Sequence, residues 1–317
     1  MRENIKVVFM GTPDFAKETF KELVESGYNV IACFTNPDKP AGRGMKLKYS
    51  AVKEYAIEKN ILVYQPAKLR NNEEVVNILK EMEPDFLVVV AYGKILPKEI
   101  LDIPRLGAIN VHGSLLPKYR GAAPMQWAII NGEEKTGITT MFMDKGMDTG
   151  DMLLKEEVAI NEEDNLESIH DRLKVVGAKL LVKTLDGLVN GTLKGEKQAG
   201  EATYAPMISR EMTKIDFTKT AKQIHDFIRG LCPFPGTYME LENGKKYKVF
   251  SVNAIKDENI DNSIENGSII LMSKNSLHIK CKDGYVKILE IQPENSKRMS
   301  ITAFLAGNKL SMLDKFI

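Results

Sequence analysis

The stretch that decides the fold is residues 5–36, IKVVFMGTPDFAKETFKELVESGYNVIACFTN. It begins with an apolar run that stops at a glycine, which is typical of a buried strand. Pro13 then suits a helix start, apolar residues recur at helical spacing, and Gly27 ends the helix before a second apolar run. A strand, a helix and a strand at this spacing predict a βαβ unit, in which the two strands are parallel.

The same alternation continues as far as residue 189. Further strands are expected at 85–92, 107–113 and 137–143, and helices at 50–59, 71–82, 122–131 and 164–189. Asn165 is in position to cap the last helix. Apolar strands that alternate with helices indicate a parallel sheet covered on both faces, so we expect a doubly wound, Rossmann-like α/β domain. Only Gly11 occupies the first turn; the GxGxxG pattern is absent, and a dinucleotide cofactor has little support.

The pattern changes after residue 189. Residues 190–208 are rich in glycine, lysine and glutamate and lack periodicity, which favours a linker. One more helix is expected at 218–231, and five short strands separated by turn sequences follow within 236–293. This spacing predicts a small, OB-like β-barrel. The expected organisation is a first domain at 1–189, a linker at 190–208 and a C-terminal barrel domain at 209–317.

The composition fits a soluble protein of two domains, since 43% of the 317 residues are hydrophobic and 27% are charged. No apolar run approaches the roughly 18 residues that span a bilayer. Cys33, Cys232 and Cys281 lie far apart, which argues against a disulfide framework or a zinc site. We expect a cytoplasmic monomer without a membrane contact or a metal. Residues 206–317 carry a net charge of +4 against −3 for the remainder, which permits an anionic partner for the C-terminal part.

Of the four histidines, His112 has the most suggestive position. It ends a predicted buried strand of the parallel sheet, and in such folds ligands bind beyond the carboxyl ends of the strands. Asn110 lies two residues earlier, so both side chains are expected on the same side of the strand. His170, His225 and His278 are interpreted as structural.

A third candidate lies in the segment MFMDKGMDTGDMLL, residues 141–154, where another strand ends in a loop with aspartates and glycines. A carboxylate beside His112 would orient its ring, and Asp144, Asp148 and Asp151 are the choices. An amide, an imidazole and a carboxylate suit direct acyl transfer to an amine. That reaction needs a donor for the developing oxyanion and a group that moves protons, but no enzyme nucleophile.

The segments NVHGSLLPKYRGAAP (110–124) and MDKGMDTGDML (143–153) resemble the folate-dependent formyltransferase family. The resemblance implies a formyltransferase that uses 10-formyltetrahydrofolate, with Asn110, His112 and Asp148 as the catalytic residues. It implies folate contacts from the SLLP turn, from the segment VVVAYGKILP (88–97) and from the aspartate loop. The residues expected to bind folate are Ser114, Leu115, Leu116, Pro117, Leu96 and Asp144.

Other blocks resemble those members of the family that formylate methionyl initiator tRNA. They are VFMGTPDFA (8–16), PDKPAGRGMKL (37–47), ATYAPMISREMTKIDF (202–217), IRGLCPFPGTY (228–238) and MSITAFLAG (299–307). The resemblance implies that the loop at 37–48 and the barrel contact tRNA. By its residues alone, this loop is an extended basic segment with one acid, Asp38, which favours salt-dependent phosphate contacts. Its expected tRNA-binding residues are Lys39, Arg43, Lys46 and Lys48.

Two other functions stay open at this point. A formyltransferase for a small amine, such as an amino sugar or a nucleotide, would fit the first domain, although the basic loop and the barrel argue against it. An RNA-binding protein with a vestigial first domain would fit the barrel, although the intact Asn110, His112 and Asp148 argue against that.

Overall fold

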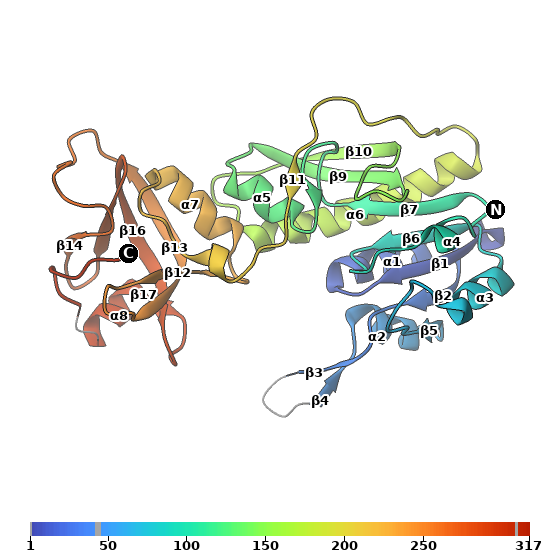
Figure 1. Ribbon diagram of the computed structural model, residues 1–317, viewed down its shortest axis with the longest axis horizontal. Helices are drawn as coiled ribbons and strands as arrows, with labels where there is room; N and C mark the ends of the chain where they lie inside the picture. Colours follow the sequence, from blue (N-terminus) through green and yellow to red (C-terminus); the bar gives the residue numbers. More distant parts are fainter. Residues whose placement is uncertain (1, 42–45, 308–309) are drawn as a thin grey trace. The chain divides into compact units, whose positions relative to one another are not determined.

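The βαβ unit is present in the computed structural model, which describes residues 2–41, 46–307 and 310–317 (Figure 1). Strand β1 (Lys6–Gly11) leads into helix α1 (Asp14–Glu25) and then into β2 (Asn29–Phe34). The two strands pair in parallel. Helix α1 buries one apolar stripe, and Phe20 on this stripe stacks on Phe9 of β1 with ring centroids 4.8 Å apart.

A seven-stranded sheet forms around this unit in the order β10-β9-β7-β6-β1-β2-β5. The added strands are β5 (Leu62–Tyr64), β6 (Phe86–Val90), β7 (Gly107–His112), β9 (Lys135–Phe142) and β10 (Met152–Ala159). Strands β5, β2, β1, β6 and β7 are all parallel, and β9 runs antiparallel to β7. Because the chain adds parallel strands on both sides of β1, the predicted doubly wound, mostly parallel sheet is confirmed.

The helices of this part are α2 (Ala51–Glu58), α3 (Glu73–Met82), α4 (Lys98–Leu101) and α6 (Leu166–Val189). Asn165 caps α6 as expected, because its Oδ1 accepts a hydrogen bond from the Ser168 amide at 3.0 Å. Gly177 of α6 lies against Val111 of β7, where an added Cβ would come within 3.1 Å of Val111 Cγ1. Helix α6 therefore covers the face of β7 that carries Val111, and Asn110 and His112 point to the opposite face.

By its contacts the chain divides into two compact units. The first comprises Met1–Gly121, Thr136–Ala159 and His170–Tyr204, and the second comprises Ala122–Lys135, Ile160–Ile169 and Ala205–Ile317. Within the second unit, α5 (Pro124–Ile130) packs on α7 (Ala221–Gly230), where Gly230 leaves room for Ile130. The short sheet formed by β8 (Arg120–Gly121) and β11 (Tyr204–Ala205) lies where the two units join along the chain.

The second unit contains an antiparallel sheet in the order β12-β13-β16-β15-β14, with β17 paired to β16. These strands are β12 (Thr237–Glu240), β13 (Lys246–Lys256), β14 (Ile269–Met272), β15 (Leu277–Cys281), β16 (Gly284–Pro293) and β17 (Met299–Ser300). The amide of Phe316 donates to Gly267 O at 2.9 Å, and that of Ile317 donates to Glu240 O at 2.8 Å. The C-terminal residues thus connect the two edges of the sheet, and the predicted small barrel is confirmed.

Several elements were not predicted from the sequence. They are β5, β8, β10, β11, β17, α4, helix α8 (Ile301–Gly307), and the 3₁₀ turns η1 (Arg2–Asn4) and η2 (Glu211–Thr213). The segment 37–48 was expected to be an extended loop. Its described parts form two short antiparallel strands, β3 (Lys39–Ala41) and β4 (Lys46–Lys48).

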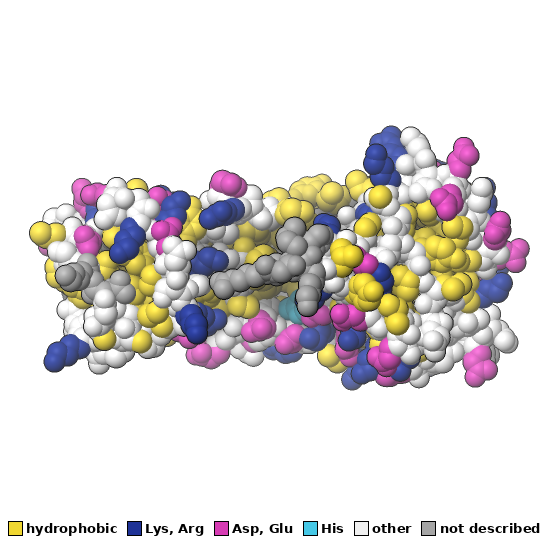
Figure 2. Space-filling view, turned by 90° about the horizontal axis from the view of Figure 1, so that it is seen from below, with side chains coloured by type: hydrophobic (Ala, Val, Ile, Leu, Met, Phe, Trp, Pro, Cys, Tyr) yellow, Lys and Arg dark blue, Asp and Glu magenta, His cyan; other side chains and the backbone are white. Residues whose placement is uncertain are grey.

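Charged side chains of both signs are interspersed on the face shown in Figure 2, and hydrophobic side chains lie between them. Within the described residues, no helix combines the length and apolar character needed to cross a membrane.

Candidate active site

Strand β7 places Asn110 and His112 on one face of the sheet at its carboxyl end. Asn110 pairs with Val89 of β6 and with Met141 of β9, and His112 pairs with Thr139 of β9. The Asn110 side chain is half-buried, and among the described residues its amide has no hydrogen-bond partner. His112 is only 5% exposed. The strand thus presents an unpaired amide next to a buried imidazole.

The His112 ring is held by a hydrogen bond at one nitrogen and faces a carboxylate with the other. Its Nε2 lies 2.9 Å from the carbonyl oxygen of Tyr119. Because a carbonyl only accepts hydrogen bonds, this contact requires the proton on Nε2. The other nitrogen, Nδ1, lies 3.7 Å from Asp148 Oδ1, which is beyond direct hydrogen-bond distance. A polar group can therefore bridge Nδ1 to the carboxylate.

Asp148 is the one of the three candidate aspartates that faces His112. Its Oδ2 accepts a hydrogen bond from the Gly121 amide at 2.8 Å, which aims Oδ1 at the ring. Asp144 instead accepts bonds from Gly146 and Thr149 within its own loop, and Asp151 pairs with Lys197 at 2.8 Å. The structure therefore brings Asn110 and His112 of β7 together with Asp148 of the loop that follows β9.

The backbone of this loop is unusual at two positions. Asp148 has a φ of +55°, a left-handed conformation that costs a non-glycine residue on the order of 1 kcal/mol or more. At Gly150, an added Cβ would lie 1.8 Å from the carbonyl oxygen of Phe142, so no other residue fits without moving β9. The Asp148 carboxylate is thus set by a loop whose shape depends on tight backbone packing.

The turn after His112 is fixed to β9. Thr139 Oγ1 donates to Ser114 O at 2.7 Å and accepts from the Leu116 amide at 3.1 Å. The Ser114 hydroxyl is fully buried and donates to Lys118 O at 2.6 Å, and Lys155 Nζ donates to Leu116 O at the same distance. The turn predicted to bind folate therefore has a defined shape before any ligand binds.

The other predicted folate residues differ in exposure. Leu115 and Pro117 are half-buried, whereas Leu116 is buried. Leu96 is 4% exposed and belongs to the apolar cluster around β6 and α4. Asp144 is exposed in the loop that follows β9.

A sequence model described as "Formyl transferase" matches residues 4–185, which is more than half of the chain. The chain belongs to the formyl transferase family. A second model of this family, described as "Formyl transferase, C-terminal domain", matches residues 207–309. The protein is therefore a formyl transferase enzyme, as the motifs around Asn110 and Asp148 predict.

Among its relatives, the "Methionyl-tRNA formyltransferase" of Caldanaerobacter subterraneus subsp. tengcongensis is 51% identical over 96% of this chain and 98% of its own length. A solved N-formyltransferase from Helicobacter canadensis, in complex with folinic acid and dTDP-3-aminofucose, gives a TM-score of 0.65 at 19% identity. That match covers 93% of this chain and 100% of the other. HypX from Aquifex aeolicus in complex with tetrahydrofolic acid gives 0.62 at 16% identity and covers 96% of this chain. The chain spans about half of HypX, 47% of its length. These two structures show a shared fold.

The basic segment of this formyl transferase has its two described ends paired. Lys39 of β3 lies directly opposite Lys48 of β4, and both are exposed. Asp38 does not neutralise them, because hydrogen bonds from Lys53 and Gln65 engage its carboxylate and lower its pKa. Arg43 lies outside the described residues. For Lys46 the backbone position in β4 is described, but its side chain is not.

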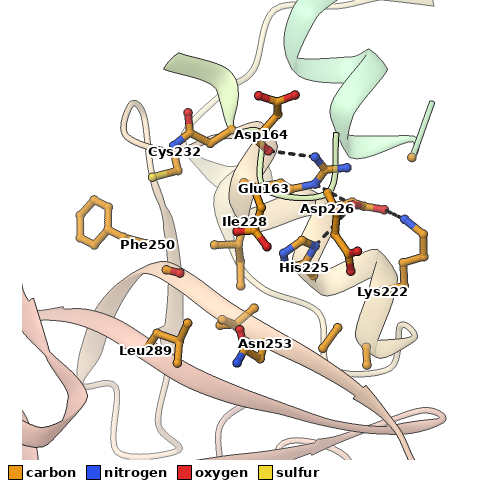
Figure 3. Close-up of a pocket in the computed structure, with 18 of the residues that line it drawn as sticks. Glu163, Asp164, Lys222, His225, Asp226, Ile228, Cys232, Phe250, Asn253 and Leu289 are labelled. Carbon is orange, nitrogen blue, oxygen red and sulfur yellow. Dashed lines mark hydrogen bonds and ion pairs between the residues drawn. The ribbon is translucent and has the colours of Figure 1, made fainter. Parts of the chain in front are cut away.

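A cavity of about 1250 Å³ lies in the second unit, and its lining does not include Asn110, His112 or Asp148 (Figure 3). Charged side chains of α7 form one wall, where Lys222, His225 and Asp226 lie close together, and Asn253 and Leu289 come from the barrel strands. Asp226 is 3% exposed and accepts hydrogen bonds from Lys222 at 2.7 Å and from Arg229 at 2.8 Å. Burial raises the pKa of Asp226, but hydrogen bonds from His225, Lys222 and Arg229 outweigh it and lower the pKa to about 2.

Replacing Asp226 by asparagine is expected to destabilise the protein at pH 7 but not at pH 2. A carboxylate whose pKa is lower in the folded state than in the unfolded state stabilises the fold above the unfolded pKa, and this contribution disappears as the pH falls through the folded pKa. The shift of the Asp226 pKa corresponds to about 2 kcal/mol at neutral pH, lost between about pH 4 and pH 2. Urea unfolding of wild type, Asp226→Asn and the exposed control Glu162→Gln across this range measures the difference. A constant gap between wild type and Asp226→Asn at all pH values would contradict this account.

Two residues close to the site were not identified from the sequence. Gln198 Nε2 donates to the carbonyl oxygens of Asp148, at 2.7 Å, and Gly150, at 2.9 Å. Its Oε1 accepts two bonds from Arg120. Arg120 lies in the segment that identified the family, but nothing there indicated its partner. Gln198 lies in the aperiodic segment 190–208, where the sequence carries no signal of a structural role. Among the described residues, no group of three or more His, Cys, Asp or Glu side chains could hold a metal ion.

Proposed function

We propose that this enzyme transfers the formyl group of 10-formyltetrahydrofolate to the α-amine of methionyl initiator tRNA. The observation that carries the proposal is the 51% identity to a methionyl-tRNA formyltransferase over nearly the whole of both chains. This identity extends beyond the formyl transferase domain to the C-terminal domain. In this proposal residues 1–189 carry the chemistry, 190–208 are the linker and 209–317 bind tRNA in the cytoplasm.

In the proposed reaction the neutral amine attacks the formyl carbon, and the bond between that carbon and N10 of the folate breaks. The amine loses one proton and N10 gains one, so the products are formylmethionyl-tRNA and tetrahydrofolate. Negative charge develops on the formyl oxygen during the attack, and Asn110 supplies an N–H donor for it. The half-buried amide has no partner among the described residues, so it is available for this oxygen.

His112 and Asp148 are assigned the proton handling. Tyr119 O keeps a proton on Nε2, so a second proton on Nδ1 gives an imidazolium whose Nδ1–H can donate to the formyl oxygen. Asp148 lies beside this nitrogen and stabilises the charged ring. At 3.7 Å, Nδ1 and Oδ1 are close enough for one water molecule or substrate group beside them to hydrogen-bond to both and to mediate the transfer toward N10.

The residues proposed to bind the folate are those of the turn Ser114–Pro117, with Leu96 and Asp144. The turn fits this role because Thr139 and Lys155 hold its backbone in place, while Leu115 and Pro117 stay partly accessible. The pteridine and the formyl group would then lie next to Asn110 and His112.

The hairpin formed by β3 and β4 is proposed to contact tRNA phosphates through Lys39, Arg43, Lys46 and Lys48. Two lysines directly opposite each other on paired strands repel, and a phosphate placed between them would relieve this repulsion. The barrel offers a second basic surface around Tyr238. Its ring lies 5.2 Å from Lys246 Nζ, and Lys248 is its cross-strand partner.

A formyl transfer assay tests the proposal. Purified enzyme and labelled 10-formyltetrahydrofolate are mixed with methionyl initiator tRNA, methionyl elongator tRNA, free methionine or a dTDP-linked amino sugar. We expect formylation of methionyl initiator tRNA and little with the other acceptors. Preferential formylation of the amino sugar would replace the proposal by the small-amine alternative. Folate binding without transfer to any of these acceptors would also refute it.

A further inference from the structure

Gln198 connects the two loops that surround His112. Its side-chain N–H groups donate to Asp148 O at 2.7 Å and to Gly150 O at 2.9 Å, and its Oε1 accepts from Arg120 Nη2 at 2.6 Å and from Nε at 3.1 Å. Because a guanidinium only donates and backbone carbonyls only accept, these partners leave one possible orientation for the amide. All four bonds of the Gln198 amide are therefore made within the loops after β7 and β9.

The Gln198 amide supports both residues that face the His112 ring, Asp148 and Tyr119. On one side it holds the carbonyls of Asp148 and Gly150, and thus the left-handed backbone from which the Asp148 carboxylate projects. On the other side it holds Arg120, whose neighbours contact the site directly. The preceding residue, Tyr119, accepts from His112 Nε2, and the following residue, Gly121, donates to Asp148 Oδ2.

Further hydrogen bonds hold segment 190–208 against the loops that follow β7 and β9. Glu196 and Met152 exchange two hydrogen bonds of 2.8 Å, which ties the segment to the start of β10. The carbonyl oxygen of Thr203 accepts a hydrogen bond from the Arg120 amide, and the hydroxyl of Thr203 accepts one from the Tyr119 amide, each at 2.9 Å. Gln198 is therefore anchored on both sides along the chain, and its amide position does not depend on a mobile loop end.

We infer that Gln198, through Arg120, is a positioning residue for the reaction: it sets the Asp148 carboxylate and the Tyr119 carbonyl at the distances that orient His112. Gln198 touches no reacting atom in this assignment and acts only through Asp148 and residues 119–121. In metal sites, residues that hold a histidine ring through hydrogen bonds fix its orientation and tautomer, and their loss typically costs about 10- to 100-fold in metal affinity or activity. We expect an effect of the same size here. The inference rests on the proposed function for its assay, but the geometry that it concerns is independent of the acceptor.

The test compares Gln198→Ala, Gln198→Glu and the control Lys197→Ala. Glutamate keeps an acceptor for Arg120 but removes the donors to Asp148 and Gly150, so both Gln198 variants should lose about 10- to 100-fold in kcat. The KM for methionyl-tRNA should change less than about twofold, because the amide is not expected to contact substrate. Lys197 contacts Asp151 at the surface, and its variant should retain wild-type kcat.

A double-mutant cycle separates positioning from general destabilisation. Because Gln198 acts through Asp148 and residues 119–121 in this inference, Gln198→Ala should lower kcat by a clearly smaller factor in the Asp148→Ala background than in wild type. Multiplying effects in the double variant, or an unchanged kcat in Gln198→Ala, would overturn the inference.

The ¹⁵N signals of the His112 ring, recorded without substrate, distinguish a failure of this inference from a failure of the proposed function. The chain has four histidines, so the ¹⁵N signals of the His112 ring can be assigned by comparison with His112→Gln. In Gln198→Ala they should shift toward their values in Asp148→Ala. Unchanged ring signals would overturn the positioning role even if the enzyme formylates a different amine, whereas a shift would support it in that case.

Discussion

His112→Ala is expected to lower the kcat of formyl transfer by about 10³-fold while the protein stays folded. In the proposed mechanism the ring moves the protons, and no other imidazole of the described residues lies near Asp148. Removing it also leaves the Asp148 carboxylate without the charged partner that the proposed mechanism requires. Steady-state kinetics with methionyl initiator tRNA and a thermal melt measure the two quantities separately.

The matched control is His170→Ala. His170 lies on α6 in the same unit, where it is half-exposed and packs against Phe15 with ring centroids 5.5 Å apart. Its loss should leave kcat within about twofold of wild type, because surface substitutions away from special features have small effects. Turnover of His112→Ala within tenfold of wild type would remove this residue from the mechanism.

The Asp148→Asn variant tests whether the negative charge of Asp148 is required for the reaction. An amide at this position can still accept the hydrogen bond from the Gly121 amide, so the loop should keep its shape. It can no longer stabilise an imidazolium, and a loss of about 10²-fold is expected for this reason. If Asp148→Asn were as active as wild type while His112→Ala was inactive, the ring would act without its carboxylate.

The core of the sheet was predictable because its strands are apolar along their whole length. Strands β1, β6 and β7 are buried on both faces, and their sequences contain few polar residues. The carboxyl end of β7 could therefore be located, and with it the positions of Asn110 and His112. The apolar runs did not indicate that β9 runs antiparallel to β7.

The edge strands were missed for the opposite reason. Strand β10 lies at one edge of the sheet, where Lys155, Glu156 and Glu157 are exposed and interrupt any apolar pattern. Strand β5, at the other edge, has only three residues. Edge strands of this kind carry charges or are short, so local sequence patterns indicate them poorly.

The choice among the three aspartates was also beyond local sequence rules. Asp144, Asp148 and Asp151 occur in one loop with similar neighbours, and only the resemblance to a family selected Asp148. In the structure the selection depends on the left-handed backbone at Asp148 and on the Gly121 amide, which comes from a different loop. The hydrogen bonds of Gln198 are even harder to predict from local sequence, because their partners lie 48 to 78 residues away along the chain.

Asn110→Ala is expected to lower kcat by about 10²- to 10³-fold and to leave stability nearly unchanged. Removing a donor from a developing oxyanion has an effect of this size because the bond strengthens as charge builds up on the oxygen. Stability should persist because the amide has no hydrogen-bond partner among the described residues, so its removal leaves no buried group unsatisfied. Single-turnover formyl transfer, measured at saturating folate, reports the chemical step directly.

Asn165→Ala is the matched control, because we expect it to lower stability and to leave the rate unchanged. Asn165 caps α6 through its side-chain oxygen, so its loss should lower the free energy of unfolding by about 1 kcal/mol without changing the single-turnover rate.

Asn110→Asp should be at least as slow as Asn110→Ala, because a carboxylate of the same shape has no N–H donor and would place a negative charge beside the oxyanion. Retention of activity in Asn110→Asp would show that the amide nitrogen is not the donor. The hydrogen bond to the formyl oxygen would then have to come from His112 alone.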